Sequence, residues 1–172
     1  MEYILHPIFV HFPIALLLLY SVIKILPLSK YFPKFAWKHV EIVLLITGVM
    51  GAFVAIVTGE DAKELLQINS ELVNKHELFA NISIWIYVAI LLGETLSFIN
   101  PKLILNENLQ KLTPYTLFIE KVLTNNILSK ILALCGLVSI SITGMLGGIL
   151  VYGLSADPLA PIVLRLLGIE IR

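Results

Sequence analysis

The side chains with the widest chemistry in this sequence are its four histidines, His6, His11, His39 and His76. A neutral imidazole is a common ligand for zinc, copper and haem iron. Two carboxylates, Glu60 and Asp61, could add oxygen ligands or hydrogen-bond acceptors. The single cysteine, Cys135, lies in an apolar run and belongs to no Cys-x-x-Cys motif. We therefore expect any site to be built from imidazoles and carboxylates, with the thiol packed as a small hydrophobe.

The elements that position these residues come from an apolar composition. Of the 172 residues, 58% are hydrophobic and 14% are charged, and the mean hydropathy is +0.93. Soluble domains average about 45–50% apolar and about 25% charged residues. The composition excludes a water-soluble enzyme, a disordered chain and a disulfide scaffold, and it indicates a membrane protein. The balance of 12 basic against 12 acidic residues also excludes a basic nucleic-acid-binding protein.

Four apolar stretches are long enough to cross a bilayer, which takes about 20 residues of helix. Backbone groups in lipid must be paired within their own segment, so we expect each stretch to be a helix. The sequence therefore predicts an all-α, integral-membrane four-helix bundle over residues 1–154. Its spans lie near residues 7–26, 37–58, 77–98 and 127–152.

Two further segments are expected to be helical without crossing the membrane. The connection 100–126 is long enough for a short surface helix, and Pro101 and Pro114 punctuate it. The tail 155–172 is apolar but too short to span, and it opens with Asp157 as a possible cap and Pro158 at the first helical position. We expect an interfacial helix there, with a segment that docks on a partner as the alternative.

The placement of lysines predicts the orientation of the four spans. The connections after the first and third spans each carry four lysines: Lys24, Lys30, Lys34 and Lys38, then Lys102, Lys111, Lys121 and Lys130. The connection 59–76 is instead acidic. Because Lys and Arg are enriched on the cytoplasmic side, the N- and C-termini and the acidic connection should be extracytoplasmic. We expect a multi-pass protein of the bacterial inner membrane.

This topology gathers the candidate ligands at one membrane face. His6 and His11 lie at the outer end of the first span, and His76 lies at the outer start of the third. Glu60 and Asp61 follow the outer end of the second span. His39 falls at the opposite face, which sets it apart from the other three.

Two histidines on different helices can hold a haem between them. His11 and His76 fit this role because they come from different spans, and His6 and Asp61 could then hydrogen-bond the ligand rings or a propionate. Five residues turn a helix by about 500°, so the rings of His6 and His11 diverge on a regular helix. Pro13 removes a backbone hydrogen bond, and a kink there could bring the two rings closer.

Two other interpretations of the same residues stay open. His6, His11, His76 and Asp61 together could form a non-haem copper or zinc site. The histidines could also simply reach water or cap helix ends at the interface. The chain would then be a structural subunit of a larger membrane complex.

Two features lie apart from the histidines. Glu94 falls inside the third span, where an ionisable side chain suggests a proton path or a partner lysine. The fourth span contains Gly144 and Gly148, a spacing that allows close helix packing and would also admit a flat macrocycle.

The first span opens with a distinctive run, His6-Pro7-Ile8-Phe9-Val10-His11-Phe12-Pro13-Ile14. It resembles the His-Pro-x-x-Val-His-Phe-Pro-Ile signature of a family of small bacterial four-helix membrane proteins of unknown function. That family also tends to have Gly-x-x-Asp after the second span, a histidine before the third, and Gly-Gly-x-x-Val-Tyr in the fourth. This chain offers Gly59-Glu60-Asp61, one residue shorter, then His76, and Gly147-Gly148-Ile149-Leu150-Val151-Tyr152.

The resemblance implies a role in electron transfer, because relatives can resemble membrane modules that accompany Rieske or cytochrome domains. Together with the histidines, it favours a subunit that binds b-type haem rather than a self-contained enzyme. Its partners would be the lipid bilayer, a quinone or a periplasmic cytochrome, and other membrane subunits or further copies of the chain.

Overall fold

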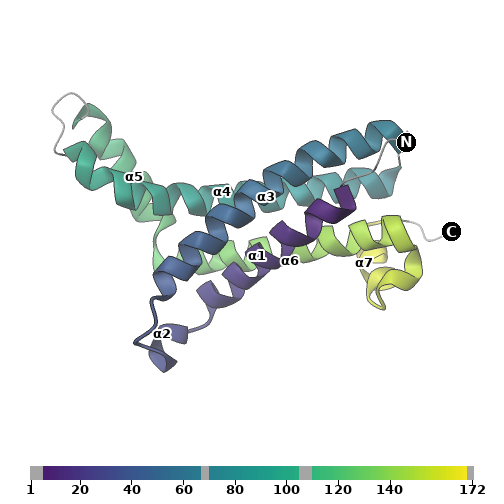
Figure 1. Cartoon of the computed structure of the whole chain (residues 1–172), viewed down its shortest axis with the longest axis horizontal. Helices are drawn as coiled ribbons and strands as arrows, with labels where there is room; N and C mark the ends of the chain where they lie inside the picture. The colour runs from purple at the N-terminus through teal and green to yellow at the C-terminus, as the bar shows by residue number, and fades with distance from the viewer. Residues whose placement is uncertain (1–5, 67–69, 105–109, 170–172) are drawn as a thin grey trace.

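The computed structural model describes residues 6–66, 70–104 and 110–169, and every regular element in these ranges is a helix (Figure 1). Four helices are long: α1 (His6–Ile25), α3 (Trp37–Leu66), α4 (Glu71–Ile104) and α6 (Asn126–Tyr152). Three are short: α2 (Leu28–Tyr31), α5 (Thr113–Leu123) and α7 (Ala160–Leu166). Single turns of 3-10 helix occupy Gln110–Leu112 and Leu154–Ala156. The predicted all-α architecture with four long apolar helices is confirmed.

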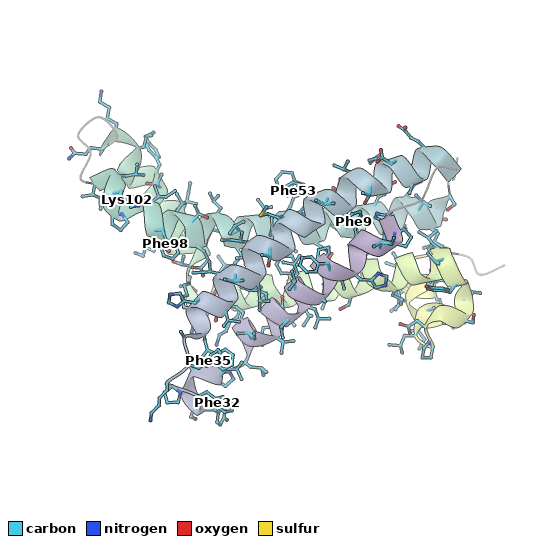
Figure 2. The ribbon with its side chains drawn as sticks, viewed as in Figure 1. Phe9, Phe32, Phe35, Phe53, Phe98 and Lys102 are labelled. Atoms are coloured by element: carbon cyan, nitrogen blue, oxygen red, sulfur yellow. The ribbon has the colours of Figure 1, made fainter. Side chains whose placement is uncertain are left out.

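The four long helices have the length and composition of membrane spans. Many of their large apolar side chains point outward, such as Trp85, which is 66% exposed. Figure 2 shows Phe53 and Phe98 on the outside of the bundle and Phe32 and Phe35 near α2. Four apolar helices of membrane-spanning length with such an outer surface suggest a multi-pass membrane protein.

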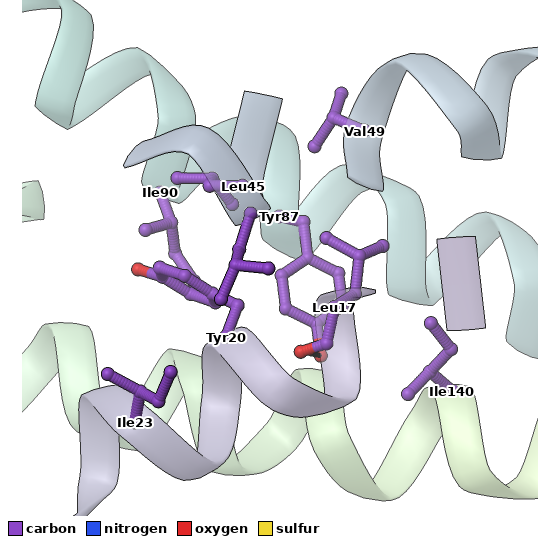
Figure 3. Packing of buried hydrophobic residues seen from close by; sticks show 9 residues of the cluster. Leu17, Tyr20, Ile23, Leu45, Val49, Tyr87, Ile90 and Ile140 are labelled. Carbon is purple, nitrogen blue, oxygen red and sulfur yellow. Dashed lines mark hydrogen bonds between the residues drawn. The ribbon is translucent and has the colours of Figure 1, made fainter. Parts of the chain in front are cut away.

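The bundle is held by two closely packed helix pairs. Helix α1 packs along α3, α4 packs along α6, and α1 also lies against α6. The core where they meet contains Leu17, Tyr20, Leu45, Tyr87 and Ile140, all nearly inaccessible (Figure 3). The α1–α3 contact is close because α3 has Gly48 there, where an added Cβ would lie 2.6 Å from a methyl group of Leu17. Small residues at such contacts let membrane helices approach.

Helices α3 and α4 are longer than the predicted spans. Helix α3 ends at Leu66, eight residues after position 58, and α4 begins at Glu71, six residues before position 77. Hydropathy marks only the part of a helix that fits the lipid, whereas helix-forming residues such as Ala62, Lys63 and Glu64 continue the backbone beyond it. A salt bridge of 2.7 Å joins Lys63, in the extension of α3, to Glu77, the first residue of the predicted third span.

The tail also begins differently from the expectation. Helix α7 starts at Ala160 rather than at Pro158, and its cap position is Leu159 without a side-chain cap. Asp157 instead accepts a hydrogen bond from the Leu159 backbone N–H at 2.7 Å, which forms a turn before the helix. Ala160 and Leu164 are buried in one cluster with Leu146 and Ile149 of α6, so the tail packs on the bundle.

The helices define two ends of the bundle (Figure 1). At one end α1 begins, α3 ends, α4 begins and α6 ends; we call it the histidine end because His6 and His76 lie there. At the other end α1 leads into α2 and then α3; we call it the lysine end because Lys24 and Lys38 lie there. The histidines and the ion pairs discussed below lie at these two ends.

Candidate functional site

The rings of His6 and His76 lie together at the histidine end. Their centroids are 6.3 Å apart and their planes are nearly perpendicular, at 86°. His6 is the first residue of α1, and His76 is near the start of α4. Both side chains are partly buried. Two segments that are 70 residues apart in the sequence therefore place two imidazoles edge to face.

A threonine on α3 holds the His6 ring. The ring Nδ1 lies 3.2 Å from Thr58 Oγ1, and the same hydroxyl oxygen is 3.1 Å from the carbonyl oxygens of Val54 and Ala55. A hydroxyl has one hydrogen, which these carbonyls take, so the oxygen accepts from Nδ1–H. The network thus assigns the tautomer in which Nε2 carries a lone pair.

A backbone carbonyl on α6 holds the His76 ring. Its Nδ1 lies 3.0 Å from the carbonyl oxygen of Thr143. A carbonyl can only accept, so Nδ1 donates its hydrogen and Nε2 again carries the lone pair. Metal-ligating histidines almost always donate their other ring N–H in this way, which fixes the orientation and raises the basicity of the ligand.

Two glycines provide the space for these rings. A Cβ added at Gly59 of α3 would lie 3.1 Å from Cε1 of His6, and one added at Gly147 of α6 would lie 3.2 Å from Cε1 of His76. Both distances are shorter than ordinary van der Waals contact. Each ring therefore sits directly on the backbone of a neighbouring helix, and all four long helices contribute to the site.

The other sequence-predicted residues are placed differently. His11 is exposed, and its Nδ1 lies 2.6 Å from the carbonyl oxygen of Pro7, one turn earlier. Glu60 and Asp61 are exposed after Gly59, and His39 is exposed at the lysine end. Among the described residues, the ring that contacts His76 is that of His6. The turn of a regular helix over five residues explains why His11 points elsewhere.

Four residues of the site were not singled out as site residues by the sequence: Thr58, Gly59, Thr143 and Gly147. Gly148 was selected instead of Gly147, one position away on α6. The sequence does contain a pattern that could have identified them. Thr58 comes directly before Gly59, and Thr143 comes one turn before Gly147, in the parts of the second and fourth spans that lie at the histidine end. Each pair places a hydrogen-bond acceptor beside a position without a side chain.

The lysine end holds a second, charged cluster. Glu94 of α4 is 93% buried and forms ion pairs with Lys38 and, at 3.5 Å, with Lys24. Lys24 also pairs with Glu41 of α3 at 3.1 Å. The predicted pairing of Glu94 with a lysine is thus present. Two positive and two negative charges compensate one another across three helices.

The histidine pair is the arrangement that could still bind a ligand, through the ring Nε2 atoms. Both rings are oriented through Nδ1, and both keep an Nε2 lone pair for a ligand. Within residues 6–66, 70–104 and 110–169, no group of three or more His, Cys, Asp or Glu side chains gathers that could hold a metal ion. Comparison of the chain with family models, curated proteins and solved structures finds no match.

Proposed function

We propose that the protein is a membrane redox subunit that binds b-type haem at the histidine end, with His6 and His76 as the axial ligands. The observation that carries the proposal is the pair of imidazoles from two helices, each oriented through Nδ1 and each with Nε2 available. His6 here replaces His11, the partner of His76 suggested by the sequence, because the ring beside His76 is that of His6.

The donor set fits haem better than a bare metal ion. Protein zinc sites use three or four protein ligands, whereas haem iron needs only axial ligands from the chain. Two imidazoles from different helices, with ring centroids 6.3 Å apart, would supply such a pair of ligands.

The residues of the chain would tune the bound group rather than react themselves. The acceptors at Thr58 and Thr143 orient the two rings, and they would increase the basicity of the rings as ligands and so tune the potential of a bound haem. Haem, when bound, supplies one-electron chemistry. Electrons would pass between a quinol in the bilayer and an acceptor at the extracytoplasmic face of a bacterial inner membrane.

An absorption spectrum of the detergent-purified protein tests the proposal, first oxidised and then reduced with dithionite. We expect a Soret band and sharp α and β bands after reduction, which are typical of a six-coordinate haem. His6→Ala and His76→Ala should each abolish these bands. His11→Ala and His39→Ala are the matched controls, and both should keep them, because these rings are exposed and lie apart from the pair.

Three results would overturn or redirect the proposal. A featureless spectrum after haem supplementation would remove it. Loss of the bands in His11→Ala but not in His6→Ala would restore the pair suggested by the sequence. Copper or zinc found by elemental analysis and lost in His6→Ala and His11→Ala would favour the non-haem site, and the structural-subunit hypothesis would remain if none is found.

A further inference from the structure

The end of α4 and the whole of α5 form an arm at the lysine end. The ion pairs of Glu94 lie at the level where α1 ends and α3 begins, so the rest of α4 extends past that level. Helix α5 packs back along this extension, and a Cβ added at Gly93 of α4 would lie 2.6 Å from the Cβ of Leu123. Figure 1 shows the two helices projecting together from the bundle. We call residues 98–104 and 110–123 the α4–α5 arm.

The outer surface of α5 is apolar. Its exposed apolar residues are spaced at i, i+3, i+4 and i+7, as one helix face requires: Tyr115, Phe118, Ile119 and Val122. Tyr115 is 71% exposed and Phe118 is 68% exposed. Glu120 points the other way, toward α4, where it accepts a hydrogen bond from Asn100. An exposed apolar face beside polar residues marks a surface that another molecule covers, either a protein or a membrane.

The residues of this face are ordered by depth in the bilayer. Helix α5 ends with Leu123 beside Gly93, so Val122 lies nearest to the hydrocarbon and Tyr115 lies farthest from it. The predicted third span ends at residue 98, and the six further residues of α4 rise about 9 Å. The headgroup layer is about 5–8 Å thick on each side of a bilayer. An aliphatic side chain at the edge of the hydrocarbon and a tyrosine among the headgroups are typical of a membrane surface.

Exposed lysines accompany this apolar face. Lys102, Lys111 and Lys121 are exposed on the arm, and none of them forms a salt bridge within the part of the chain that the structure describes. Lys102 follows Phe98 by four residues, so both lie on one side of α4 (Figure 2). Lys121 follows Phe118 by three residues and therefore borders the apolar face of α5. The charge on the arm is thus complementary to an anionic group outside the chain.

A second segment at the lysine end has the same composition. Phe32 and Phe35 are exposed between α2 and α3, and Lys30 and Lys34 beside them are exposed as well. Figure 2 shows the two phenylalanines near α2, on a different projection from Phe98. A protein partner bound to the α4–α5 arm would leave this second segment unexplained. A layer of anionic lipid around the whole lysine end accounts for both segments.

The opposite end of the bundle exposes charges of the other sign. Glu60, Asp61, Glu64 and Glu71 are all exposed there. These carboxylates would repel an anionic headgroup, whereas the lysines of the arm would attract one. A preference for anionic lipid should therefore be confined to the lysine end.

We infer that the α4–α5 arm lies in the headgroup layer of the cytoplasmic leaflet and binds anionic phospholipids through Lys102, Lys111 and Lys121. The apolar face of α5 enters the edge of the acyl chains, and the lysines contact the phosphates. The lysine distribution predicts that this end is cytoplasmic, where anionic lipids give the leaflet a negative potential. Each lysine near such a surface strengthens binding by about five-fold. The inference needs no haem, so its test and the absorption spectrum can fail independently.

Quenching of a tryptophan on the arm tests the inference. Phe118→Trp is made in a chain whose two own tryptophans are removed by Trp37→Phe and Trp85→Phe, and this reporter chain is reconstituted in full length into phosphatidylcholine vesicles. A fixed fraction of the lipid carries brominated acyl chains, either as phosphatidylglycerol or as phosphatidylcholine. We expect several-fold stronger quenching by the brominated phosphatidylglycerol. The difference should shrink in about 1 M KCl, where the Debye length is about 3 Å.

Replacement of the lysines shows whether they cause the preference. Lys102→Gln, Lys111→Gln and Lys121→Gln together should reduce the quenching by phosphatidylglycerol to the level of phosphatidylcholine. Lys75→Gln, at the histidine end, is the matched control and should keep the preference. Circular dichroism shows whether each variant folds, and Tyr115→Trp replaces the reporter if Phe118→Trp does not fold.

Three outcomes would overturn the inference. Equal quenching of the reporter by both lipids would exclude a preference for the anionic one. An unchanged preference in the triple lysine variant would exclude the lysines as its cause. Absence of quenching by either lipid would place the arm outside the bilayer. In that case, tryptophan emission that shifts when the protein is diluted in lipid would identify a second copy of the chain as the molecule that covers the arm.

Discussion

The two ends of the bundle bury polar groups by opposite means. At the lysine end, full charges neutralise one another, as Glu94 contacts both Lys24 and Lys38. At the histidine end, the imidazole Nδ1 atoms lie within hydrogen-bond distance of the Thr58 hydroxyl and the Thr143 carbonyl oxygen. The charged groups of the lysine end pair with one another, whereas the imidazole Nε2 atoms of the histidine end could bind a ligand. The end with fewer internal contacts is therefore the better candidate for a ligand site.

The comparison is tested most strongly at Glu94. Among the residues that the structure describes, Glu94→Ala leaves Lys24 paired with Glu41 alone and leaves Lys38 without its partner. Removing one member of a buried ion pair costs about 3–5 kcal/mol, and we expect the lower part of this range because Lys38 is 53% exposed. Unfolding in mixed micelles with increasing dodecyl sulfate measures the loss. The exposed Glu64 is the control, and an equal effect of Glu64→Ala would contradict the assignment.

The histidine end should respond in ligand affinity rather than in stability. Thr58→Val keeps the shape of the side chain but removes the acceptor of the His6 Nδ1–H. Loss of such an outer hydrogen bond typically weakens metal binding by about 10–100-fold, and we expect this effect on haem. Titration of the apoprotein with haem measures it. Thr47→Val alters a hydroxyl that bonds only within α3 and should leave the affinity unchanged.

The glycine beneath His76 should act in the same direction with a smaller effect. In Gly147→Ala the new methyl group would lie 3.2 Å from the ring, which must move by a few tenths of an ångström. We expect several-fold weaker haem binding without loss of stability, because alanine favours the helix more than glycine does. Gly144→Ala is the control one turn earlier, where the nearest atom is 3.7 Å away. Equal haem titration curves for both variants would argue that the contact between Gly147 and the His76 ring does not affect haem binding.

The smallest effect is expected between the two ends. Tyr20→Phe removes a buried hydroxyl without a partner in the described structure, so we expect a gain in stability of about 1 kcal/mol. Tyr87→Phe removes a hydroxyl that is paired with Ser21 and should lose about 1 kcal/mol. The same micelle unfolding experiment compares them. A loss of stability in Tyr20→Phe would mean that its hydroxyl has a partner after all.

The four long helices could be predicted from the sequence because the length and hydropathy of an apolar stretch are enough to identify them. It was also sufficient to place His6 and His76 at one end, since alternating spans must return to the same face. It was not sufficient to choose between His6 and His11. That choice depends on the rotation of α1 about its axis, which is set by contacts such as Pro13 against Gly51, with 3.4 Å to an added Cβ.

The residues that contact the histidine rings, such as Thr143 and Gly147, could not be predicted from the sequence for a related reason. Thr143 acts through its backbone carbonyl, which every residue has, so its type gives no signal. Gly147 rather than Gly148 faces His76, and one position on a helix is a rotation of about 100°. The start of the tail depended on local competition, in which Asp157 formed a turn with Leu159 instead of capping a helix.

The extended tips of α3 and α4 have a consequence for how electrons could reach the site. Gly59, beneath His6, lies seven residues before the end of α3, and His76 lies five residues after the start of α4. At 1.5 Å per residue, these lengths are roughly 10 and 7 Å. A soluble protein resting on the tips, which the Lys63–Glu77 bridge holds together, therefore stops short of the rings. Electrons can tunnel over such a distance, whereas bulky molecules cannot reach the rings. The ends of α3 and α4 would therefore allow electron transfer to a haem while keeping other reactants away from it.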